Sequence, residues 1–102
     1  MQLRIGYRNY DVIDTPELDL ADRGHSAEIH FRDGLILVSP EGPKAHRVEK
    51  ILHEVMHGFL YDAGINLEDD MEETVVLALT PRFTAFLRDN PIQVRKFIKD
   101  LQ

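Results

Sequence analysis

The spacing of hydrophobic residues changes at the segment Pro-Glu-Gly-Pro of residues 40–43. Before this segment, short runs of β-branched, aromatic and aliphatic residues alternate with polar ones, which is typical of strands. After it, hydrophobic residues recur every three or four positions, which is typical of amphipathic helices. Strands followed by helices in a chain of 102 residues indicate one α+β domain that spans residues 1–102.

The strand signals lie in two regions. Residues 3–13 are rich in β-forming residues and predict one strand with a break near Asn9. Residues 15–26 are polar and predict a loop. The clearest alternation covers residues 27–39, where a tight turn at Gly34 precedes a short apolar strand. We therefore expect a small antiparallel sheet of about three strands at the N-terminal side.

Three helices are predicted after the sheet. Residues 44–63 show helical periodicity and end at Gly64, a residue that suits the end of a helix. A second helix is expected from near Met71, and Pro81 should weaken or kink it. Asn90 and Pro91 then form a cap with proline at the first helical position, which predicts a short helix to about residue 100.

The first predicted helix carries the sequence His-Glu-Val-Met-His at residues 53–57. Residues four apart project from the same helix face, so His53 and His57 can reach one ion. Catalytic zinc sites use three protein ligands and a water, and Glu54 is placed to accept a proton from that water. The pattern predicts Zn²⁺ binding by His53 and His57, with Glu54 as general base. The competing interpretation is two surface histidines beside a surface glutamate.

The third zinc ligand must come from a carboxylate. The chain has no cysteine, and none of its five histidines follows residue 57. The candidate acidic residues after the motif are Asp62, Glu68, Asp69, Asp70, Glu72, Glu73 and Asp89. Glu72 and Glu73 stand in the first turn of the second predicted helix, which a short connection brings back to the motif. Helical phase directs Glu72 toward the centre of the apolar side and Glu73 toward its edge, so we expect Glu73 to be the ligand, with Glu72 as the alternative.

This order of strands, HExxH helix and glutamate helix resembles the gluzincins, and is most similar to small phage- and prophage-type metallopeptidases related to the ImmA/IrrE family. In that family the ligand glutamate is followed after three residues by a small or aliphatic residue and after six by a large apolar one. Val76 and Leu79 match this phasing when Glu73 is the ligand. Leu-Arg-Asp-Asn-Pro at residues 87–91 also matches the end of that helix in the short phage proteins. Leu77 departs from the pattern, because the family usually has Asn or Asp there.

The resemblance implies a zincin-like fold, bound zinc and a regulatory protein as substrate. Two broader classes of function are disfavoured by composition. The net charge of −6 argues against nucleic-acid binding. No apolar run reaches the roughly 20 residues of a membrane span, and the first residues lack the apolar core of a signal peptide. Together with the lack of cysteine, these features lead us to expect a cytoplasmic protein.

Zinc-dependent hydrolysis of a peptide or protein substrate is the leading functional hypothesis. An extended substrate could add to the sheet beside the strand that contains Ile36 and Val38. His46 lies too far along the helix to share the ion but could line the cleft. The main alternative is a regulatory or protein-binding module that holds zinc and hydrolyses little. A structural protein with an accidental motif is the third possibility.

Overall fold

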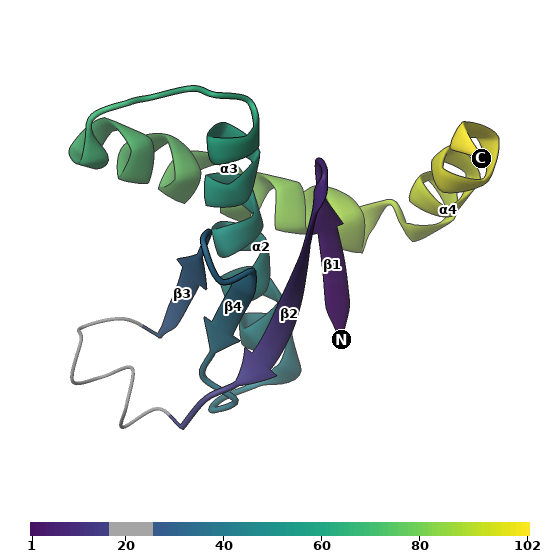
Figure 1. Ribbon diagram of the computed structural model, residues 1–102. Coiled ribbons are helices and arrows are strands. Elements are labelled where there is room, and N and C mark those ends of the chain that lie inside the picture. Colours follow the sequence, from purple (N-terminus) through teal and green to yellow (C-terminus); the bar gives the residue numbers. More distant parts are fainter. Residues whose placement is uncertain (17–25) are drawn as a thin grey trace.

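The computed structural model describes residues 1–16 and 26–102, which form a four-stranded sheet and three helices (Figure 1). In chain order the elements are β1 (Gln2–Ile5), β2 (Arg8–Asp14), β3 (Ala27–His30), β4 (Leu35–Val38), α2 (Lys44–Asp62), α3 (Asp69–Asp89) and α4 (Pro91–Leu101). The predicted α+β class is confirmed. The loop predicted at 15–26 falls mostly on residues 17–25, outside the described part of the chain.

The sheet is mixed, so the prediction of an antiparallel sheet of about three strands is wrong. Its strand order is β1-β2-β4-β3, with antiparallel outer pairs and a parallel pair β2–β4 at the centre. The region predicted as one strand at 3–13 is a hairpin, and its break lies at Gly6 and Tyr7 rather than near Asn9. Gly6 adopts a φ of 61°, a left-handed conformation that glycine tolerates and that tight hairpin turns require.

The strand order also corrects the expected site of substrate addition. β4 is paired on both sides, with β2 and with β3, and the side chains of Ile36 and Val38 are fully buried. A further strand therefore cannot pair with β4. The described sheet ends instead at β1 and at β3.

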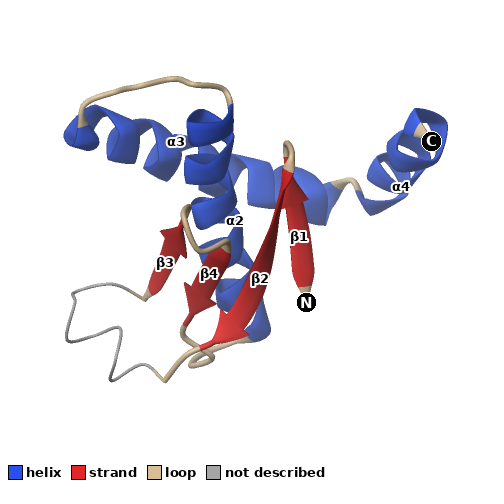
Figure 2. Ribbon diagram, viewed as in Figure 1, coloured by secondary structure: helices blue, strands red, loops and turns tan. Residues whose placement is uncertain are grey.

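Helix α2 covers one face of the sheet and packs on β1, β3 and β4 (Figure 2). The core between them contains Ile5, Tyr10, Val12, Ile36, Val38, Ile51 and Val55. Gly58 packs closely against the sheet, because an added Cβ would lie 2.8 Å from the Ile5 Cδ1 atom. Because Gly58 directly follows His57, the close packing of α2 on β1 at this glycine also fixes the position of the motif relative to the sheet.

Helix α3 crosses α2 and packs against it. Gly64 was predicted to end the first helix. It follows the end of α2 with a φ of 70°, as this role requires. α3 starts at Asp69, two residues before the predicted Met71, and remains helical through Pro81. Among the described helices, none is long and apolar enough to cross a membrane.

Helix α4 has Pro91 in its first turn, as predicted, and extends away from the body of the protein (Figure 1). The expected capping bond from the Asn90 side chain does not form. The Asn90 Nδ2 atom instead donates a hydrogen bond to the backbone carbonyl of Phe86 at 3.0 Å, because the amide turns back toward the end of α3.

Candidate metal centre

His53 and His57 lie on successive turns of α2, on the side that faces α3. Their ring centroids are 5.0 Å apart, and both side chains are largely shielded from solvent. The i, i+4 spacing places both Nε2 atoms over the same stretch of α3. The two histidines of the motif thus point into one small volume between the two helices.

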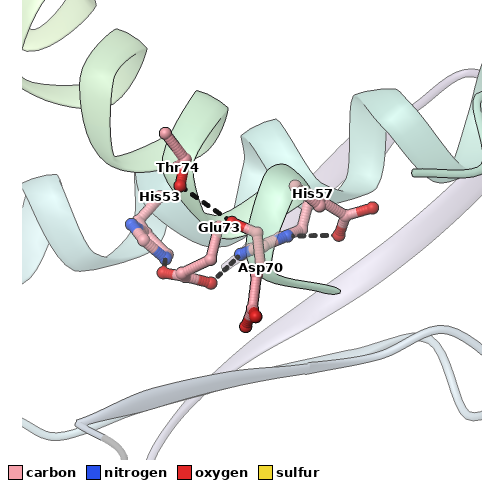
Figure 3. A network of polar contacts seen from close by, with 6 residues as sticks. His53, His57, Asp70, Glu73 and Thr74 are labelled. Atoms are coloured by element: carbon pink, nitrogen blue, oxygen red, sulfur yellow. Dashed lines mark hydrogen bonds and ion pairs between the residues drawn. The ribbon is translucent and has the colours of Figure 1, made fainter. Parts of the chain in front are cut away.

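Glu73, in the first turns of α3, lies between the two histidines (Figure 3). Its Oε1 atom is 3.0 Å from His53 Nε2, and its Oε2 atom is 3.1 Å from His57 Nε2. One ligand atom from each residue falls within 4.8 Å of the other two. Ligand atoms about 2.0–2.2 Å from a tetrahedral zinc ion are separated by roughly 3.3 Å. Two imidazole nitrogens and a carboxylate at these distances therefore fit a zinc ion.

Glu72 contacts the opposite edge of the His57 ring. Its Oε2 atom lies 2.6 Å from His57 Nδ1. An ionised carboxylate only accepts hydrogen bonds, so with an ion on Nε2 it would accept the Nδ1 proton in a hydrogen bond and hold the ring in orientation. The sequence raised Glu72 as an alternative ligand, but the structure places it beside the ring rather than in the three-residue cluster.

Glu54 is buried, with 7% of its surface exposed, and lies next to the cluster. Burial raises its pKa to about 7, the positive charge of His57 opposes this rise, and the negative charge of Glu73 adds to it. Burial also lowers the pKa of His53, against the attraction of Glu73. A histidine whose pKa is lowered is more readily neutral at physiological pH, which is the form that binds metal.

A cavity of about 890 Å³ opens beside these residues. Its walls are edge strand β3, the sequence from His46 to His57 on α2, and the sequence from Glu72 to Pro81 on α3. His46 lines it as the sequence allowed. Tyr61, one turn after His57, stacks on Phe31 with ring centroids 4.1 Å apart and is not among the lining residues.

The α3 wall of the cavity combines apolar side chains with an unusual buried hydroxyl. Leu77, at the position where the resembled family has Asn or Asp, is 57% exposed. Thr80 is buried, and its Oγ1 atom has no hydrogen-bond partner among the described residues. Sequence reasoning missed Thr80, because a threonine in a helix ordinarily bonds to solvent or to a backbone carbonyl of the preceding turn.

The geometry can be set against known proteins. No family model, curated protein or solved structure matches this chain. A function for this chain is therefore inferred from the chemistry of its own residues His53, Glu54, His57, Glu72 and Glu73.

Proposed function

We propose that this protein is a zinc-dependent peptidase of the gluzincin type. One observation supports the proposal most strongly. The two carboxylate oxygens of Glu73 lie within 3.1 Å of the Nε2 atoms of both motif histidines, although Glu73 is distant in sequence and belongs to another helix. A carboxylate centred between two histidine Nε2 atoms beside a cavity is the arrangement that a zinc site with two histidines and one glutamate requires.

Each residue has a distinct role in the proposed reaction. His53, His57 and Glu73 would hold zinc, which supplies positive charge that acidifies water and polarises a carbonyl group. Glu54 accepts the proton of the attacking water and delivers it to the amine that leaves when the peptide bond breaks. Glu72 holds the His57 ring in orientation through Nδ1. The burial that raises the pKa of Glu54 to about 7 suits a group that must accept and then return a proton.

The substrate would bind along β3 rather than along β4. Among the described strands β3 pairs with β4 and forms the edge of the sheet, and it lines the same cavity as the histidines. An extended peptide that adds to this edge would form backbone hydrogen bonds while its reacting carbonyl lies over the α2 motif.

A zinc-binding regulatory module with little hydrolysis remains the second candidate. The exposed Leu77 side chain favours it, because this leucine stands in the cavity wall at a position where the resembled peptidases have a polar residue.

The deciding experiment compares zinc-loaded wild type with Glu54→Gln on a peptide library made from digested bacterial proteins. We expect cleavage by the wild type and at least 100-fold slower cleavage by the variant, because a lost general base typically reduces rates by 10²–10⁴. Both proteins should contain equal zinc. Equal cleavage by both would contradict the role of Glu54, and full zinc with no cleavage by either would favour the regulatory module.

A further inference from the structure

Helix α3 has a proline in its interior, a position where proline is unfavourable. Pro81 has no backbone N–H group, so the carbonyl of Leu77, one turn earlier, lacks the donor that an α-helix normally provides. α3 nevertheless continues to Asp89. One carbonyl in the middle of this helix is therefore left without its regular partner.

This carbonyl opens onto the cavity beside the candidate metal centre. On a helix surface the carbonyl of one residue lies between that residue and the residue four positions later. Leu77 and Pro81 both line the cavity, which places the Leu77 carbonyl on its α3 wall. Leu77 follows Glu73 by four residues, so the carbonyl lies roughly 6 Å along the helix axis from the proposed ligand.

Side chains donate to two neighbouring carbonyls of α3. The Ala78 carbonyl accepts a hydrogen bond from Arg82 Nη1 at 2.8 Å, and the Thr80 carbonyl accepts one from the Thr84 hydroxyl at 2.7 Å. The Thr80 hydroxyl could serve Leu77, because a helical threonine often donates to a carbonyl of the preceding turn. Its Oγ1 atom has no partner among the described residues, so it does not donate to Leu77.

The α3 wall thus departs from regular helix chemistry twice within one turn. The Leu77 carbonyl has lost its helical donor, and the buried Thr80 hydroxyl has no partner in the described part of the chain. Interior proline and buried unpaired hydroxyls both reduce the stability of a fold. Departures of this kind are expected at functional sites, where they leave polar groups free for a ligand.

We propose that the Leu77 carbonyl accepts a hydrogen bond from a backbone N–H of the substrate peptide, which is thereby held between β3 and α3. This inference rests on the proposed function, because it takes the cavity as the binding site of an extended peptide. Backbone N–H groups of an extended chain point alternately to its two edges. One edge of the peptide would pair with β3, and the other would meet the Leu77 carbonyl.

The spacing along α3 indicates which N–H is bonded. The roughly 6 Å between Glu73 and Leu77 corresponds to about two residues of extended chain, at about 3.3 Å each. The bonded N–H therefore belongs to a residue about two positions from the bond that is cleaved. A peptide with proline at that position has no N–H to donate and should be a poor substrate.

A purely structural role for Pro81 is the competing interpretation. Proline kinks helices, and a kink could fit α3 to the surface of α2. Such a role predicts that replacing Pro81 changes shape and stability. It does not predict that the effect on peptide binding depends on one particular N–H of the peptide.

The test uses probes that need neither a known substrate nor hydrolysis. Two short oligo-alanine peptides carry a zinc-chelating hydroxamate, one at the C-terminus and one at the N-terminus, so that the chain extends from the metal in either direction. Each backbone nitrogen is N-methylated in turn. Calorimetry measures the affinities of zinc-loaded wild type and of Pro81→Ala, which supplies the missing N–H to Leu77 and so occupies the free acceptor.

We expect N-methylation at one position, about two residues from the hydroxamate of one probe, to weaken binding to wild type roughly 3- to 10-fold, as loss of one hydrogen bond does. The same methylation should have an effect of less than about 2-fold in Pro81→Ala. The unmodified probe should bind this variant roughly 3- to 10-fold more weakly than wild type. Pro81→Ala should nevertheless melt at a higher temperature, because alanine suits a helix interior.

Thr74→Ala is the matched control for helix stability. Thr74 is an exposed residue of α3 that does not line the cavity, and alanine at this position also favours the helix. This variant should bind every probe as wild type does. A loss of affinity in Thr74→Ala equal to that in Pro81→Ala would attribute the effect to helix stability and overturn the inference.

Equal binding of the unmodified probes by wild type and Pro81→Ala would also overturn it. A methylation penalty of the same size in both proteins at every position would leave Pro81 with a structural role only. Failure of both hydroxamates to bind zinc-loaded wild type would contradict the candidate metal centre and this inference together. The expected pattern of binding would support the inference even if the wild type cleaved no peptide, because the probes are not hydrolysed.

Discussion

His57 contacts two consecutive glutamates through its two ring nitrogens. Its Nδ1 atom lies 2.6 Å from Glu72 Oε2, and its Nε2 atom lies 3.1 Å from Glu73 Oε2. Successive helical residues normally point about 100° apart, so both can meet one ring only because α3 crosses α2 beside it. The arrangement supports different proposed roles for the two glutamates, with Glu73 as ligand and Glu72 as the group that orients His57.

The first expectation concerns the relative effects of these glutamates on zinc affinity. Glu72→Gln should weaken zinc binding 10- to 100-fold, because partners that orient a ligand contribute about that much. Glu73→Ala should weaken it further, since it removes a ligand atom. Competition with a chromophoric chelator measures both. Glu68→Gln is the control, because Glu68 precedes α3 and lies outside the cluster. A larger effect of Glu72→Gln than of Glu73→Ala would reverse the assignment.

The second expectation is that zinc stabilises the fold through the motif. At a free zinc concentration 100 times the Kd, a ligand that binds the folded state alone adds about 2.7 kcal/mol to the free energy of unfolding. For a chain of this size the melting temperature should rise by roughly 10–20 °C. His57→Ala should melt at the same temperature with zinc and with a chelator. An equal zinc-induced rise in this variant would exclude His57 as a ligand.

The third expectation is a pH dependence of stability in the zinc-free protein. The pKa of Glu54 is about 7 when folded, against an ordinary value of 4.5, so the folded state binds the proton more tightly. The contribution of Glu54 to the free energy of unfolding should therefore fall by on the order of 2–3 kcal/mol as pH rises from 4.5 to 7. Above pH 7 this contribution should stay low.

Glu54→Gln isolates this contribution, because the amide does not titrate. Urea unfolding with a chelator present should show the variant to be more stable than wild type at pH 8, with the difference shrinking toward pH 4.5. A difference that is constant over this range would show that Glu54 keeps its ordinary pKa in the folded protein.

The fourth expectation concerns the hydroxyl of Thr80. Thr80→Val removes a buried Oγ1 atom without a partner among the described residues and keeps the shape of the side chain, so it should raise the free energy of unfolding by about 1 kcal/mol. Thr84→Val is the matched variant, because the Thr84 hydroxyl donates to the Thr80 carbonyl at 2.7 Å, and it should be neutral or destabilising. Destabilisation by Thr80→Val in urea unfolding would show that its hydroxyl is satisfied.

Much of the helical half could be predicted because helical periodicity is local. The limits of α2 and the proline at the start of α4 follow from spacing and capping residues within a few positions. The sheet was predicted less well. The turn at Gly6 divides a continuous β-forming region, and the parallel pairing of β2 with β4 joins segments that are far apart in sequence.

The convergence of His53, His57 and Glu73 was predictable because the two histidines share a helix and helical phase favoured Glu73. Helical phase also directed Glu72 inward, but phase alone did not identify what it meets there. His57 Nδ1 is that partner, and the contact depends on where α3 crosses α2. The burial of Thr80 depends on the same crossing, which no spacing within one helix specifies.

The proposed zinc site is tested most directly by an anomalous difference map collected at the zinc absorption edge from crystals grown with zinc. We expect one strong peak about 2.0–2.2 Å from the Nε2 atoms of His53 and His57 and from a carboxylate oxygen of Glu73, with Glu72 still hydrogen-bonded to His57 Nδ1. No peak between α2 and α3, or a peak bound by Glu72 in place of Glu73, would contradict this assignment.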